Sequence, residues 1–120
     1  MTKKQITKRT KFWQNKLGLT NWDVEALFEE FERDNDTPHA TGVAMVECNS
    51  QYKYATIRYR ISQLDQVNDA VILHELLHAL TSPLIGFVRA NKKAESWLDY
   101  FDEQIVSELE RIIMRIYKKS

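Results

Sequence analysis

Two histidines and a glutamate, in the segment His74-Glu75-Leu76-Leu77-His78, have the residue types and the spacing that suit a metal site. Residues four apart lie above one another on a helix, so His74 and His78 can direct two imidazoles at one ion. Glu75 lies about 100° further round the helix, and its carboxylate can reach a water molecule held by the metal. Zinc lowers the pKa of such a water to roughly 7, and a nearby carboxylate then accepts the proton. The segment therefore predicts one zinc ion, with Glu75 as the general base of a hydrolysis.

A catalytic zinc ion usually has three protein ligands, so the chain must supply one more. Six residues after His78 stands Leu84, where the metzincin pattern has a third histidine, and His39 lies far upstream in an expected loop. A carboxylate from the C-terminal helix is therefore expected. Helical phase places Asp102 on the apolar stripe of that helix and Asp99 on its flank, and an inward-facing acid needs a partner such as a metal.

The same two aspartates have an alternative role beside the metal. A carboxylate that accepts a ring N–H from His74 or His78 would orient that imidazole, as carboxylates behind metal ligands commonly do. The residues alone leave both roles open for Asp99 and Asp102.

Residues 71–80, Val-Ile-Leu-His-Glu-Leu-Leu-His-Ala-Leu, resemble the active-site helix of small zincin-like metallopeptidases of bacteria and phages, near the SprT-like and ImmA/IrrE-like groups. The likeness in layout covers about residues 20–117, and this helix carries its specific motif. The resemblance implies hydrolysis of a peptide or protein substrate, bound along the sheet edge, for which residues 52–60 are the candidate strand. It also implies that Glu103 is the third zinc ligand, because small gluzincins have a glutamate in a context similar to Glu103-x-x-Val106-x-x-Leu109.

Apolar residues at helical spacing predict three helices, at about residues 4–17, 66–82 and 94–117. Gly18 is expected to end the first helix and Pro83 to end the second, with residues 84–93 as a mobile connection. The last helix is expected to bury one stripe of apolar side chains: Leu98, Ile105, Val106, Leu109, Ile112, Ile113 and Ile116.

Three strands are expected between the first two helices. Alternating side chains from Trp22 to Phe31 predict a half-buried strand, and residues 40–48 and 52–61 predict a β-hairpin. The fold class is therefore α+β, a minimal zincin-like arrangement: a small sheet that contains antiparallel strands, packed on an N-terminal helix, an active-site helix and a long C-terminal helix.

The chain has 120 residues, which suits a single zincin-like domain over residues 1–120. Residues 1–11 are basic, but the 17 basic and 17 acidic residues of the chain cancel, and no DNA-binding motif is present, which favours a solvated face over DNA binding. Cys48 is the only cysteine, which excludes an internal disulfide. With no secretory signal and no apolar run of membrane-spanning length, a cytoplasmic protein without a membrane partner is expected.

Two other functions stay open at this point. The chain could be a zinc-binding module with weak or no catalysis that acts in binding or regulation, because so short a chain leaves few residues to wall a substrate cleft. It could also hydrolyse a substrate other than a peptide, although the three-histidine pattern of endoribonuclease-like metal sites is absent. The sequence predicts nothing about the oligomeric state.

Overall fold

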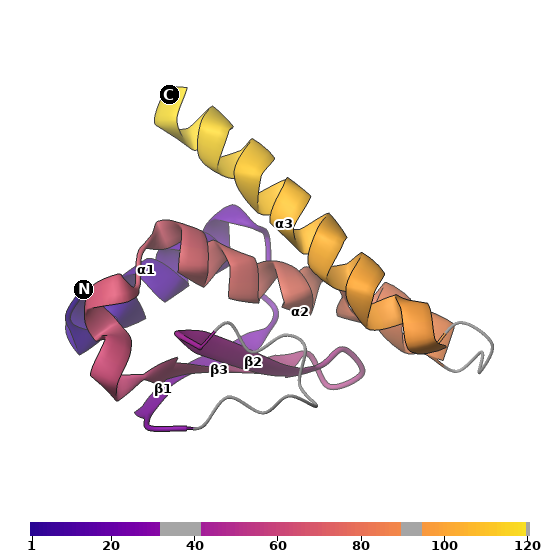
Figure 1. The fold of residues 1–120 in the computed structure, drawn as a ribbon, viewed down its shortest axis with the longest axis horizontal. Coiled ribbons are helices and arrows are strands. Elements are labelled where there is room, and N and C mark those ends of the chain that lie inside the picture. Colours follow the sequence, from indigo (N-terminus) through magenta and orange to yellow (C-terminus); the bar gives the residue numbers. More distant parts are fainter. Residues whose placement is uncertain (32–41, 90–94, 120) are drawn as a thin grey trace.

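The computed structural model of the protein describes residues 1–31, 42–89 and 95–119, without the side chains of residues 88–89, 95–99 and 119. It confirms the α+β class, with a three-stranded sheet below the helices in Figure 1. The elements in chain order are α1 (Lys3–Lys16), β1 (Asp23–Glu29), β2 (Ala44–Asn49), β3 (Tyr54–Arg60), a 3₁₀ helix η1 (Ile61–Gln66), α2 (Asp69–Arg89) and α3 (Glu95–Lys119).

The sheet has the strand order β1-β3-β2. Strands β2 and β3 form the expected antiparallel hairpin, with Val46 opposite Ile57, while β1 pairs with β3 in parallel, with Ala26 opposite Ile57. The expectation that residues 52–60 form an edge strand was wrong, because β3 lies in the middle. Of the two edge strands in the described sheet, β2 is the one that packs against α2.

Helix α2 passes through Pro83 and continues to Arg89, so the expected end before Pro83 and the expected loop at residues 84–89 were wrong. Proline cannot donate a backbone hydrogen bond, which leaves the carbonyl four residues earlier without its amide partner. Ser82 compensates for this loss, because its hydroxyl donates to the carbonyl of Ala79 at 2.7 Å. The helix can therefore extend two more turns beyond the proline.

Helix α2 is the core helix of the fold. Its buried apolar residues, Ile72, Leu73, Leu76, Leu77 and Ala79, pack between the sheet and the other two helices. Residues Asp69–Phe87 are also long and apolar enough to cross a membrane by length and composition, which corrects the expectation that no segment approaches this length. In the structure 44% of this segment is buried.

Helix α3 buries less of its apolar stripe than expected. Val106 is fully buried, and Leu109 and Ile113 are partly buried against the core. Three of the predicted core residues are exposed: Ile105, Ile112 and Ile116. The face that α3 turns toward α2 carries Asp102 in place of an apolar residue, as helical phase predicted.

Helix α1 is tied to the start of α2 by a bidentate ion pair. It begins at a capping box between Thr2 and Gln5, and it ends before Gly18, which has the left-handed φ of 72° that glycine accommodates. The guanidinium of Arg9 donates to both carboxylate oxygens of Asp69, at 2.9 and 2.7 Å. This contact holds the pKa of Asp69 below its usual 3.8, chiefly through the hydrogen bond from Arg9.

We predict that Asp69→Asn lowers the free energy of unfolding by about 1 kcal/mol at pH 7, because it removes a charge-assisted hydrogen bond at a helix N-terminus. A carboxylate with a lowered folded pKa stabilises the fold above about pH 4 and loses this effect as the pH falls through the folded pKa. Urea unfolding at pH 7 and pH 3 should show a smaller difference from the wild type at pH 3. Asp65→Asn, at an exposed aspartate, is the control, and a difference that is undiminished at pH 3 would contradict the ion-pair explanation.

Candidate metal centre

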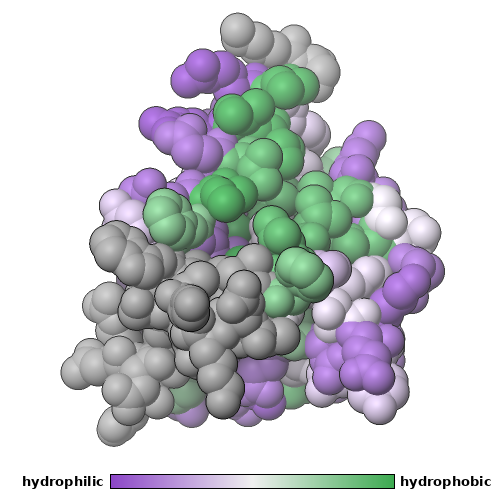
Figure 2. Space-filling view, turned by 90° about the vertical axis from the view of Figure 1, so that its right-hand side faces the viewer, coloured by the Kyte–Doolittle hydropathy of each residue, from purple (hydrophilic) through white to green (hydrophobic). Residues whose placement is uncertain are grey.

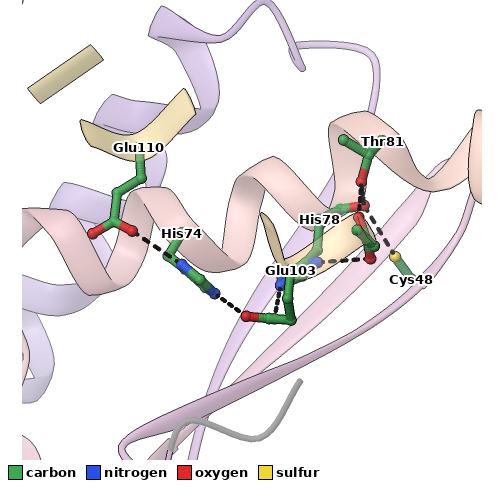
Figure 3. Close-up of polar contacts among 7 residues, drawn as sticks. Cys48, His74, His78, Thr81, Glu103 and Glu110 are labelled. Carbon is green, nitrogen blue, oxygen red and sulfur yellow. Dashed lines mark hydrogen bonds and ion pairs between the residues drawn. The ribbon is translucent and has the colours of Figure 1, made fainter. Parts of the chain in front are cut away.

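His74 and His78 project from one face of α2, as their spacing predicts. Their ring centroids are 5.1 Å apart, and both side chains are buried. Figure 3 shows His74 between Glu110 and Glu103, and His78 on the other side of Glu103. Two imidazoles are therefore held close together on a rigid helix rather than on a loop.

Helix α3 brings the carboxylate of Glu103 between the two rings. Glu103 Oε1 lies 2.8 Å from Nε2 of His78, and Oε2 lies 3.4 Å from Nε2 of His74. One ligand atom from each residue can be chosen so that all three lie within 4.8 Å of one another. In a tetrahedral zinc site the ligand atoms are about 3.3 Å apart. Small movements of these three side chains would therefore bring their ligand atoms to the distances that a zinc ion needs.

The opposite nitrogen of each ring contacts a second carboxylate of α3. Nδ1 of His78 lies 3.0 Å from Asp102, and Nδ1 of His74 lies 3.1 Å from Glu110. Asp102 also accepts a hydrogen bond of 2.8 Å from the hydroxyl of Thr81, which fixes its orientation. When each Nδ1–H donates to its carboxylate, the lone pair of Nε2 is available on the side of Glu103.

Glu75 lies one residue beyond the first histidine and points into the protein. Its side chain is 0% exposed, and neither carboxylate oxygen makes a hydrogen bond to the described residues. Its charge affects the pKa of both histidines and also that of Tyr59 on β3, which places it between α2 and the sheet. A buried carboxyl group without hydrogen bonds is costly to keep for packing alone, which points to a chemical role.

The electrostatics of the cluster follow from burial and from its excess of acids. Burial raises the pKa of Glu75 to about 8, against a smaller opposing effect of the two histidines. Burial alone would lower the pKa of His78, but its hydrogen bonds with Asp102 and Glu103 outweigh this and raise the pKa to about 9. The pKa of His74 is also raised, because Glu103 and Glu110 outweigh its desolvation. The carboxylates therefore favour the protonated form of both histidines.

A cavity of about 450 Å³ adjoins this cluster between β2 and the C-terminal half of α2. His78 and Asp102 form its inner wall, and the thiol of Cys48 lies 3.9 Å from the carbonyl oxygen of His78. Apart from His78 and Asp102, the residues that line the cavity are uncharged. The cluster is thus reached from a hollow large enough for one or two amino-acid side chains.

The structure brings together the four residues that the sequence analysis put forward for the site, His74, Glu75, His78 and Glu103. Asp102 makes the contact expected of an orienting carboxylate and contacts His78. His39 and the side chain of Asp99 lie outside the described residues.

Sequence reasoning did not assign Glu110 a role. Its position was readable, because Glu110 is seven residues after Glu103 and so lies on the same face of α3 two turns later. A glutamate at this spacing from a candidate ligand can reach the other histidine, which is one turn away on the facing helix.

No protein-family model matches this chain, and no curated protein or solved structure is significantly similar to it. The resemblance to small zincin-like metallopeptidases therefore stays a prediction, and the function must be argued from the residues and their geometry.

We predict that Asp102→Asn and Glu110→Gln each lower the affinity for a divalent metal by about 10- to 100-fold, because each removes the carboxylate that orients a histidine. The affinity is measured by competition with a chromophoric zinc chelator. Glu108→Gln is the matched control, since Glu108 is an exposed acid of the same helix that contacts neither histidine. Equal affinity in all three variants would contradict the orienting role.

Proposed function

We propose that the chain is a small zinc-dependent peptidase in which His74, His78 and Glu103 hold one zinc ion. The observation that carries this proposal is the convergence of three potential ligand atoms within 4.8 Å, from the two consecutive helices α2 and α3. Two imidazoles and one carboxylate are a ligand set that catalytic zinc sites use, with a fourth position left for water or substrate. The nearby carboxylate of Glu75 supplies the proton acceptor that such a hydrolysis needs.

When bound, zinc supplies a Lewis acid that polarises a carbonyl group and makes water a nucleophile near neutral pH. Asp102 and Glu110 hold the Nδ1 protons of the two rings, so that the Nε2 atoms are the ligand atoms. Glu75 accepts the proton of the attacking water and returns it to the leaving amine. Burial favours the protonated form of Glu75 by raising its pKa to about 8, and a bound cation close by would favour the carboxylate form that accepts the proton.

The cavity beside His78 supports a peptide as the substrate. Of the two edge strands of the described sheet, β2 is the one that packs against α2, and its backbone can pair with an extended peptide as an additional strand. The cavity lies between this strand and α2, next to the ligand cluster, so it can receive a side chain of a peptide bound along the edge. Its mostly uncharged lining favours an uncharged side chain at that position.

A zinc-binding module without proteolysis is the second candidate function. The observation that favours it is the complete burial of Glu75, which leaves the proposed base no direct contact with solvent. In that case the zinc ion would fix α3 against α2, and the cluster would have a structural role. The two functions share the ligand set and differ in whether Glu75 is needed for cleavage.

We predict that the purified protein binds about one zinc per chain, and that His74→Ala and Glu103→Ala each lose it. Wild-type protein should cleave an unstructured protein such as casein. The Glu75→Gln variant should keep the zinc, but its cleavage rate should be at least about 1,000-fold lower. Metal content is measured by mass spectrometry, and cleavage by release of labelled peptides. Glu25→Gln, at an exposed acid on the other edge strand β1, is the control.

Three outcomes separate the candidates. Zinc with cleavage that depends on Glu75 supports the peptidase. Zinc without any cleavage supports the binding module. Absence of zinc contradicts both.

The raised pKa values predict that zinc binding depends on pH. A histidine with a pKa of about 9, as for His78, carries a proton at pH 7 that must leave when the ring binds zinc. The affinity should therefore rise by up to about tenfold per pH unit from pH 6 to 8. Calorimetry at pH 7 in two buffers of different ionisation enthalpy should show the release of at least one proton per zinc. An affinity that is the same at pH 6 and pH 8 would rule out His78 as a ligand.

A further inference from the structure

The outer face of α3 carries exposed apolar residues on the flank opposite the histidines. They are Phe101, Ile105, Ile112 and Ile116, which we call the outer stripe, and each is between 44% and 63% exposed. Figure 2 shows the corresponding hydrophobic band, which rises toward the C-terminal end of α3. An exposed band of this length is unusual for a monomer, because an ordinary amphipathic helix turns such residues to the core.

Helix α2 extends the same surface. Its exposed residues Leu80, Leu84 and Phe87 recur at spacings of four and three, so they lie on one face of the helix. The hydrogen bond from Thr81 to Asp102 shows which turn of α2 lies opposite which turn of α3. By helical phase, Leu80 and Leu84 then lie on the flank away from the metal cluster, at the level of the N-terminal end of the outer stripe. The apolar surface therefore spans both helices.

The intervals between successive residues of the outer stripe are the same when counted from either end of α3. Phe101 and Ile105 are four apart, Ile105 and Ile112 are seven apart, and Ile112 and Ile116 are again four apart. Two copies of α3 that run antiparallel about a two-fold axis near Glu108 therefore place Ile105 opposite Ile112 and Phe101 opposite Ile116. Residues four apart form ridges on a helix, and ridges of this kind pack into the grooves of a facing helix.

An exposed ion pair lies to one side of the stripe, near the middle of its length. Glu108 and Arg111 form an exposed ion pair on α3. Near a two-fold axis, the Glu108 of each copy comes within reach of the Arg111 of the other, so acid and base are matched across the contact. A two-fold contact is self-complementary by nature, and this pair makes its centre neutral.

The exposed area also suits a second copy. The outer stripe and the three residues of α2 expose on the order of 700 Å² of side-chain surface per copy, close to the 800 Å² that each partner buries in an interface of standard size. That is more than the few hundred Å² of a typical apolar patch on a monomer.

We propose that the protein forms a two-fold symmetric homodimer through the outer stripe, with two α3 helices antiparallel. The contact lies on the flank opposite the metal cluster and leaves the cavity beside His78 accessible in both copies. The dimer does not depend on the proposed peptidase activity, because its test measures the mass of the assembly without zinc or substrate.

The test is analytical ultracentrifugation of the full chain from about 1 to 100 μM, where the wild type should sediment at twice the chain mass at the upper end. Ile105→Glu and Ile112→Glu should each raise the dissociation constant at least about 100-fold, because each substitution buries two charges in a symmetric interface. The matched control is Ile61→Glu, at an isoleucine that is 45% exposed, as Ile105 is 44% exposed, but lies in η1. Circular dichroism melting shows that each variant is folded.

Disulfide trapping tests the antiparallel register. In a Cys48→Ser background, a mixture of Ile105→Cys and Ile112→Cys chains should form mixed disulfide dimers faster than either variant alone. Faster trapping of each variant with itself would overturn the antiparallel arrangement.

A wild type that is monomeric at 100 μM would overturn the dimer, and so would a dimer unaffected by both glutamate substitutions. Binding of a monomeric wild type to anionic lipid vesicles, reduced in Ile105→Glu but not in Ile61→Glu, would also overturn it by assigning the stripe to a membrane surface.

Discussion

The contact between α2 and α3 depends on a group of carboxylates around two buried imidazoles. Glu75 and Asp102 are buried, and Glu103 and Glu110, whose side chains are 28% and 25% exposed, complete the group around His74 and His78. Four acids so close together cannot all be ionised in a low-dielectric site unless positive charge balances them. The raised pKa values of the histidines and of Glu75 are the response of the protein itself to this constraint. A divalent cation would satisfy the same constraint while leaving both rings neutral.

This cluster also determines how α3 attaches to the rest of the protein. Three acids of α3 face the histidines of α2, while Val106 is its one fully buried apolar residue in the described part of the helix. A helix held in this way depends on polar contacts more than on a wide apolar face, so its attachment is sensitive to the charge state of the cluster. The proposed ion would bind between the two helices, and its binding free energy would therefore stabilise the α2–α3 contact.

The sequence predicted the parts of the structure that depend on local spacing. The motif from His74 to His78, the hairpin of β2 and β3, and the inward position of Asp102 all follow from periods of 3.6 or 2 residues. The path of α2 through Pro83 was missed, because it depends on the hydroxyl of Ser82 replacing the lost amide. The parallel pairing of β1 with the middle strand was not predictable in the same way, since the alternation of side chains is identical for parallel and antiparallel neighbours.

The largest error concerns α3 and has one cause. Its isoleucines were assigned to the core by their helical period, but period shows only that residues share a face and not which face is covered. In α3 three acids share the face toward α2 with Val106, while three isoleucines lie exposed on another flank of the helix. Each of these two features costs stability in an isolated chain, because carboxylates are desolvated and apolar surface is hydrated. A cation at the inner face and a second copy at the outer face would each remove one of these costs, which is why the two proposals concern opposite sides of the same helix.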